Sequence, residues 1–439
     1  MLETLAPPEP AAAIRWNLPT RIAFRFSFLY FGLYVLTTQM LGGLWIVPTL
    51  RPPDTGATGW MLRPIAWTAD RVFHTRPDYV RQLTGSGDKT IDWVHVFLLL
   101  VFSIAATIVW SAVDRRRAHY ASVHKWFHLF LRVAAGATMV GYGMAKAIPL
   151  QMPAPPLTRL LEKYGDFSPM GVLWYSIGAS FPYERFAGAM ELTAAVLLFV
   201  PRLSTLGAMV LVADSVQIFT LNMTYDIPVK LFSFHLILIG LVLLAPEMRR
   251  LFGVLVLNRG AGPSTLPPLA RGVIARRVLV TAQIAFGAIV IWQSYSESIV
   301  AWRARGPAAP KAPLYGIWDV QKMAIDGVER APLTTDYGRW RRVVIQNATA
   351  LSFQRMDDSF GGYLATVDPS AKTIAMKKTP QDTSPEGTFT FAQPSPDSLV
   401  LDGHLGGHTM HVETRLFDRN RFLLVSRGFN WIQERPFNR

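Results

Sequence analysis

The sequence predicts an α-helical transmembrane bundle of about seven spans, followed by an all-β antiparallel barrel or sandwich domain. Half of the 439 residues are hydrophobic and 17% are charged, whereas soluble domains carry roughly a quarter charged residues. Apolar runs long enough to cross a bilayer are concentrated before about residue 300. After residue 315, apolar and polar residues alternate with a period of two, which is typical of strands.

The charge and composition exclude several classes of function. The net charge is +14, but the basic residues lie largely at the ends of apolar runs, which indicates contact with anionic lipid rather than with nucleic acid. The chain has no cysteine, so disulfides, thiolate metal sites and CxxC redox chemistry are excluded. The first twenty residues lack the pattern of a signal peptide, and we expect the first span to direct the chain to the membrane.

The predicted helical domain covers residues 21–298 and follows a Pro/Ala-rich tail, 1–20, that we expect to be poorly ordered. Its segment 59–74 has apolar and aromatic residues at helical spacing, which suits a helix in the membrane interface or one packed on the outer domain. The predicted spans are 21–46, 91–113, 127–150, three within 183–247, and 278–298.

The distribution of Lys and Arg predicts the topology. If the spans alternate, the basic groups fall on one side, which should be cytoplasmic. These groups are Arg15, Arg21 and Arg25, then 115–117 with Lys125, then Arg202, then 249–277. We therefore expect a multi-pass protein of the bacterial inner membrane with a cytoplasmic N-terminus and an extracytoplasmic β-domain.

The C-terminal part begins with a linker, 299–314, that is rich in Pro and Ala. Residues 315–439 hold many short strand candidates separated by turn signals such as Asp326-Gly327. This length suits one barrel of roughly eight strands, either filled by side chains or holding a ligand. The aromatic, basic tail at 427–439 is expected to pack on the barrel or at the membrane surface.

Gly316-Ile-Trp318 stands at the head of the first predicted strand. It looks like the GxW signature of lipocalin-type barrels. The resemblance implies that the Trp plugs the closed end of the barrel and packs on an Arg late in the sequence. Arg427 or Arg435 would serve this role here.

Polar residues inside the predicted spans all fall in the outer half of the bilayer when depth is counted along each helix. Such residues are costly in hydrocarbon and tend to face a cavity or a bundle interior. Lys146 requires a partner, for which Glu191 or Asp214 is expected. We interpret the group as a proton-handling or quinone-headgroup site, or alternatively as structural hydrogen bonds between helices. The candidate residues are Tyr142, Lys146, Glu191, Asp214, Gln217 and His235.

Three histidines, His404, His408 and His411, flank a predicted turn at Gly406-Gly407. If His404 and His411 meet across a hairpin, the group would form a metal site. A plain glycine-rich hairpin turn is the alternative.

Residues 140–146 (VGYGMAK) and 187–191 (AGAME), with the apolar run that follows, resemble the DoxX-like family of small membrane proteins. The resemblance covers roughly residues 125–247. The ending ERPFNR is also similar to the end of larger bacterial DoxX-type proteins that carry extra spans and a β-domain. Lys146 and Glu191 are the matched positions. The thiol-relay versions of the family do not apply here, because the chain has no cysteine.

The resemblance implies an accessory subunit of a quinone-linked membrane oxidoreductase, with quinone as the small molecule and a respiratory or redox protein as the partner. The sequence contains no GxGxxG, P-loop or CxxCH motif, so no nucleotide, flavin or haem site is expected and another chain would carry the electrons. Two alternatives remain. One is a cell-envelope binding or scaffold protein whose β-domain holds a partner or lipid, and the other is a small-molecule transporter.

Overall fold

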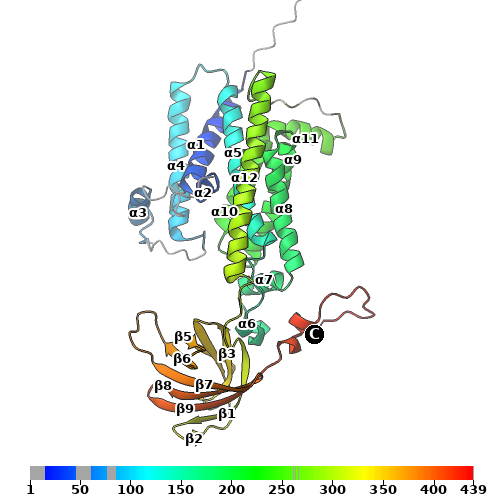
Figure 1. Ribbon diagram of the computed structural model, residues 1–439. Helices are drawn as coiled ribbons and strands as arrows, with labels where there is room; N and C mark the ends of the chain where they lie inside the picture. The colour runs from blue at the N-terminus through cyan, green and yellow to red at the C-terminus, as the bar shows by residue number, and fades with distance from the viewer. Residues whose placement is uncertain are drawn as a thin grey trace, which may run out of the picture. The chain divides into compact units, whose positions relative to one another are not determined.

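The computed structural model describes residues 15–45, 61–76, 86–260, 262, 264 and 266–438. The chain divides into two compact units, Met1–Ile148 with Arg185–Val300, and Pro149–Glu184 with Ala301–Arg439 (Figure 1). The structure thus groups the segment 149–184, which the sequence analysis assigned to the helical domain, with the β-domain. Most of the predicted N-terminal tail, 1–14, lies outside the described residues, and the first helix already begins at Leu18.

The first unit is helical. α9 packs along α10, α1 along α4 and α5, and α5 also contacts α10. The helices that lie wholly or mostly in this unit are α1 Leu18–Thr37, α2 Met40–Gly43, α3 Leu62–Arg71, α4 Thr90–Val113, α5 Ala121–Ala147, α8 Phe181–Phe199, α9 Ser204–Thr224, α10 Lys230–Leu244, α11 Met248–Leu255 and α12 Val273–Arg305, with single 3₁₀ turns η4 Pro201–Leu203 and η5 Ala245–Glu247.

In the described part of the chain, four helical segments are long and apolar enough to cross a membrane. They are Thr90–Val113, Pro201–Thr224, Lys230–Leu255 and Val273–Arg305. The prediction of about seven spans is therefore not confirmed. The other three predicted spans correspond to α1, α5 and α8, which are helical but carry buried charged side chains such as Arg25, Arg132 and Glu191. These charges lower the mean hydropathy of the three helices below that of a simple apolar span.

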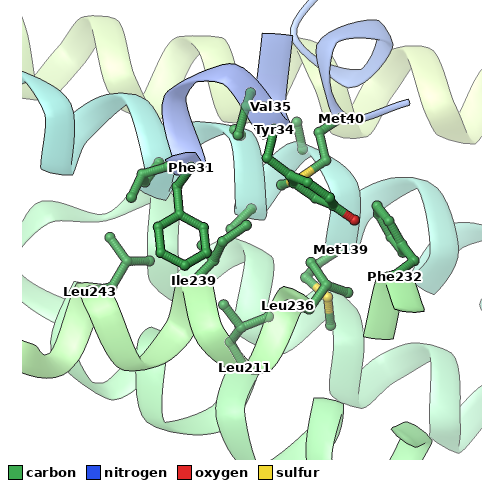
Figure 2. Packing of buried hydrophobic residues seen from close by; sticks show 14 of the residues in the cluster. Phe31, Tyr34, Val35, Met40, Met139, Leu211, Phe232, Leu236, Ile239 and Leu243 are labelled. Atoms are coloured by element: carbon green, nitrogen blue, oxygen red, sulfur yellow. The ribbon is translucent and has the colours of Figure 1, made fainter. Parts of the chain in front are cut away.

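The core of the helical unit lies where α1, α5, α9 and α10 meet. Figure 2 shows Phe31 and Tyr34 of α1 facing Met139 of α5, Leu211 of α9 and a row of residues on α10, among them Leu236 and Ile239. All of these side chains are buried. The centre of α5 reads AAGATM (134–139), and such small residues let neighbouring helices approach closely.

Helix α3 belongs to the helical unit, because it packs on α4. Its Ile65 and Ala69 are buried, whereas Trp67 is exposed. One of the two placements expected for 59–74 was packing on the outer domain. The structure differs from that expectation, because α3 packs on a helix of the bundle. Residues 59 and 60 lie outside the described residues.

The second unit contains an antiparallel barrel, which confirms the predicted β-barrel. The strands follow the order β2-β1-β3-β4-β5-β6-β7-β8-β9. An additional pairing of β1 with β9 closes β1 and the strands from β3 to β9 into a ring. Within the described residues, β2 pairs with β1 and stays outside the closed ring. The strands are β1 Gly316–Ile325, β2 Val328–Glu329, β3 Trp340–Asn347, β4 Ala350–Arg355, β5 Phe360–Asp368, β6 Thr373–Lys377, β7 Gly387–Ser395, β8 Ser398–Leu405 and β9 His408–Leu416.

The barrel interior is filled by side chains that alternate along the strands. Trp318, Phe389, Leu401 and Val412 belong to this core and are buried. The indole Nε1 of Trp318 donates a hydrogen bond to the carbonyl of Leu314 over 2.9 Å.

The arginine expected to pack on Trp318 takes another place. The guanidinium of Arg427 lies over the ring of Phe437 at 4.5 Å, and Arg435 is exposed. The tail 427–439 was expected to pack on the barrel or at a membrane surface, and its described residues are mostly exposed.

The segment 149–184 supports the barrel from outside. It contains α6 Leu157–Leu161, η3 Tyr164–Asp166 and α7 Pro169–Gly178. Leu157 is buried against Ile317 and Val344, on the outer face of β1 and β3. Its backbone N–H donates to Oε1 of Gln346 over 2.9 Å. These contacts explain why the segment belongs to the β-containing unit.

Candidate functional site

The centre of the candidate site is an ion pair between α5 and α8. Nζ of Lys146, in the last turn of α5, donates to both carboxylate oxygens of Glu191, over 2.7 and 2.8 Å. The two residues are 7% and 2% exposed. Of the two partners expected for Lys146, the structure therefore selects Glu191.

Two glycines bring these helices together. A Cβ atom added at Gly188 would lie 2.4 Å from the backbone nitrogen of Ala147, and one added at Gly143 would lie 3.0 Å from the carbonyl oxygen of Gly188. Because the two backbones are this close, Lys146 reaches Glu191 directly. A buried pair of this kind leaves an uncompensated charge if either partner is removed.

Asp214 of α9 is the second carboxylate of the site. It lies close enough to Glu191 and Lys146 to interact electrostatically with both. Its Oδ2 atom is buried and has no hydrogen-bond partner among the described residues. A buried carboxylate oxygen without a donor is unusual and costly. The atom is thus available to a donor that the protein itself does not supply.

Tyr142 lies one turn before Lys146 on the same helix. Its ring is 5.7 Å from Nζ of Lys146, and its hydroxyl accepts a hydrogen bond from Nε2 of Gln39 over 3.1 Å. The ring also contacts Phe232 of α10, with 5.9 Å between the centroids. Tyr142 therefore connects the ion pair to the segment around α2 and to α10.

His235 of α10 is held by α1 rather than by the ion pair. Its Nδ1 lies 2.7 Å from the carbonyl of Leu231, which can only accept, so Nδ1 carries the proton. Nε2 is then an acceptor, and the hydroxyl of Tyr30 donates to it over 2.8 Å. The imidazole stacks on Tyr34 with 4.0 Å between ring centroids. In Figure 2 the hydroxyl of Tyr34 points toward Phe232, and Phe232 also contacts Tyr142.

Gln217, the remaining predicted residue, is exposed on α9 and does not join this group. Conversely, Tyr30 and Tyr34 were not among the residues predicted from the sequence. The available signal was their spacing of four residues in FLYFGLYVL (28–36), which places two phenols on one helix face.

The three histidines of the barrel do not meet as a metal site. His404 and His411 are not paired directly, since His404 pairs with Thr409 and His411 with Asp402 in the β8–β9 register. No group of three or more metal-binding side chains was found in the residues that the structure describes. The alternative, a hairpin turn at Gly406-Gly407, is confirmed, and both glycines have positive φ.

Each of two barrel histidines pairs with a carboxylate instead. Nδ1 of His408 lies 2.7 Å from Asp326, and Nδ1 of His411 lies 2.5 Å from Asp402. The hydrogen bond to Asp402 raises the pKa of His411, and the hydrogen bond from His408 lowers the pKa of Asp326. Exposed pairs of this kind contribute little to stability.

Comparisons with known proteins give one informative result. No protein-family model matches the chain, and no solved structure matches it. An alignment over 148 residues, 32% of this chain, is 30% identical to the uncharacterized protein YwoB of Bacillus subtilis (strain 168) and covers 86% of that protein.

Proposed function

We propose that this chain, which belongs to the family of the uncharacterized YwoB protein of Bacillus subtilis, is an integral membrane protein that binds a quinone headgroup among its helices. The observation that carries the proposal is the buried Lys146–Glu191 pair beside Asp214, whose Oδ2 has no donor among the described residues. Ionisable groups buried inside a membrane bundle are expensive and are commonly functional.

The chemistry of the group suits a quinone. A quinone presents two carbonyl oxygens, and its reduced form presents two hydroxyls. The ammonium of Lys146 and the phenol of Tyr142 are donors suited to the carbonyls, whereas the free oxygen of Asp214 is an acceptor suited to a hydroxyl. Carboxylate and ammonium groups at this place would also take up and release the protons that accompany quinone reduction.

The membrane arrangement that we propose adds α1, α5 and α8 to the four apolar segments, giving about seven spans. Arg25, Lys146 and Glu191 on these helices are buried inside the unit rather than on its surface. In this arrangement the basic groups of the sequence lie at the helix ends on one side of the membrane, which favours a cytoplasmic N-terminus in a bacterial inner membrane and an extracytoplasmic barrel. A reporter fused after Arg439 that works only in the cytoplasm would contradict this topology.

In this proposal the chain is an accessory subunit of a quinone-linked oxidoreductase, as the DoxX-like resemblance implies. The protein contributes the headgroup site and the proton-handling residues, and a partner redox protein contributes the electrons. The resemblance supports this assignment at Lys146 and Glu191, the two positions that also form the ion pair.

The test is to purify the full chain from native-like membranes in mild detergent and to quantify bound quinone by absorption and mass spectrometry. Stoichiometric quinone is expected in the wild type and in the Gln217→Met control, which changes an exposed polar residue of α9. The variant Lys146→Met/Glu191→Gln removes both charges of the ion pair and should lose the quinone. Absence of quinone from the wild type, or its retention in the double variant, would overturn the proposal.

A second candidate function, envelope binding by the β-containing unit, is favoured by one observation. A groove of about 520 Å³ lies between the α6–η3 segment and the β4–β5 hairpin, with Arg159, Lys163, Ser352 and Phe360 in its lining. A lipid or protein partner that co-purifies without quinone, and that is lost on filling the groove with Ser352→Trp, would favour this function.

A further inference from the structure

The end of the chain carries an exposed apolar surface that neither proposed function uses. We define the C-terminal arm as residues 419–438. It contains the turn η6 Arg419–Arg421 and the short helix α13 Leu423–Ser426, and the rest is irregular. Trp431 is 90% exposed and Ile432 is 83% exposed, and Leu424 and Phe429 are exposed as well. Phe422 packs against the cluster of Leu157, Ile317 and Val344, whereas these four side chains are not buried against the barrel.

Phe429, Trp431 and Ile432 form one exposed apolar cluster within the arm. The rings of Phe429 and Trp431 lie edge to face with 5.0 Å between centroids, and Ile432 follows directly. Burying such side chains is favourable relative to leaving them exposed to water. A contiguous exposed apolar cluster is typical of a surface that binds a partner or a membrane.

The charge of the arm indicates which body covers it. The arm contains four arginines and one carboxylate, Glu434. The arginines are Arg419, Arg421, Arg427 and Arg435. Arginines interleaved with Trp and Phe are typical of segments that lie at a bilayer surface, where the rings sit at headgroup level. Basic residues near a membrane are attracted to anionic lipid headgroups.

The chain itself keeps a bilayer within reach of the arm. α12 is one of the four segments apolar enough to span, and it ends at Arg305. The first barrel strand begins at Gly316, so the linker 306–315 extends at most about 36 Å. A barrel held on so short a tether meets the membrane surface at a high effective concentration.

We propose that the C-terminal arm is a membrane-interface anchor, which inserts Phe429, Trp431 and Ile432 into an anionic bilayer surface. The proposal rests on the membrane insertion of the helices proposed above, but not on quinone binding. The occupant is the lipid surface, recognised by apolar insertion together with headgroup–arginine attraction.

The absence of cysteine from the chain makes a direct test simple. A single nitroxide is attached at Ile432→Cys in the full chain, which is reconstituted in nanodiscs that contain anionic lipid. Collision rates with oxygen, which concentrates in lipid, and with a water-soluble nickel chelate are then measured by electron paramagnetic resonance. Two further single-site variants are the references, Ile108→Cys on the exposed face of α4 for lipid and Val328→Cys on the exposed strand β2 for water.

The expected result is a several-fold lower nickel collision rate at 432 than at 328, with oxygen access close to that at 108. Replacing the anionic lipid with zwitterionic lipid should move the value at 432 toward that at 328. If 432 matches 328 while 108 lies in lipid, the anchor is wrong and membrane insertion stands. If 108 itself collides freely with nickel, membrane insertion fails as well. Shielding of 432 from both reagents would show a protein cover and would also overturn the anchor.

Discussion

Removing the charge of Lys146 alone should destabilise the helical unit strongly. The variant Lys146→Met leaves the carboxylate of Glu191 buried, at 2% exposure, without the ammonium that now donates to both of its oxygens. Loss of one partner from a buried pair costs about 3–5 kcal/mol. The double variant Lys146→Met/Glu191→Gln removes both charges, and its cost should fall short of the sum of the two single variants by about 3 kcal/mol.

The assay is reversible unfolding of the purified chain in mixed micelles of nonionic detergent and sodium dodecyl sulfate, followed by helical circular dichroism. Gln217→Met is the matched control, because it changes a polar residue that is exposed on α9 and should leave the unfolding midpoint unchanged. A cost of about 1 kcal/mol or less for Lys146→Met, the value of an exposed pair, would refute the reasoning. Strict additivity of the two single variants would refute it equally, since the pair would then not be coupled.

Two further predictions follow from close packing and from protonation. Gly188→Ala places a Cβ atom 2.4 Å from the backbone nitrogen of Ala147, so α8 must move away from α5. The free energy of unfolding should fall by about 1–3 kcal/mol, and the thermal midpoint should fall with it. Gly141→Ala, which meets open space, is the control, and equal midpoints would contradict the expectation. The hydrogen bond to Asp402 raises the pKa of His411; this stabilisation is complete below the unfolded pKa of about 6.5 and is lost as pH rises through the higher folded value. Amide hydrogen exchange of the β8–β9 hairpin in the full chain should thus quicken between about pH 6 and 8, beyond its intrinsic pH dependence. The increase should be smaller in the variant His411→Gln. Identical pH profiles for the two proteins would contradict the prediction.

The barrel was the part of the fold most open to prediction. Alternating residues and turn signals at Asp326-Gly327 and Gly406-Gly407 mark short strands without any tertiary contact. The pairing of β1 with β9, by contrast, joins strands far apart in the chain. The contact of Trp318 illustrates this limit. Its place at the head of β1 was foreseen, but its partner is the nearby carbonyl of Leu314 rather than a distant arginine.

Mean hydropathy marks four helical segments in the described part of the chain as candidate membrane spans. Hydropathy identifies Thr90–Val113 and Val273–Arg305 directly. It cannot place α1, α5 and α8 in the same way, because a charged residue lowers the mean hydropathy equally whether it faces a partner or a solvent. Whether Arg25 or Glu191 is buried depends on the neighbouring helices, and both are buried here.

The sequence by itself determined which chemical groups the site holds, because ionisable residues in apolar runs are visible without coordinates. It predicted Lys146, Glu191, Asp214 and His235, and it restricted the partner of Lys146 to two carboxylates. Only the tertiary structure decided that Glu191 is that partner, that Gln217 is exposed, and that Tyr30 binds His235. The physical reason is that a hydrogen bond extends about 3 Å. Its formation therefore depends on the approach and rotation of helices, which glycine contacts such as that of Gly188 set and which periodicity along one helix does not contain.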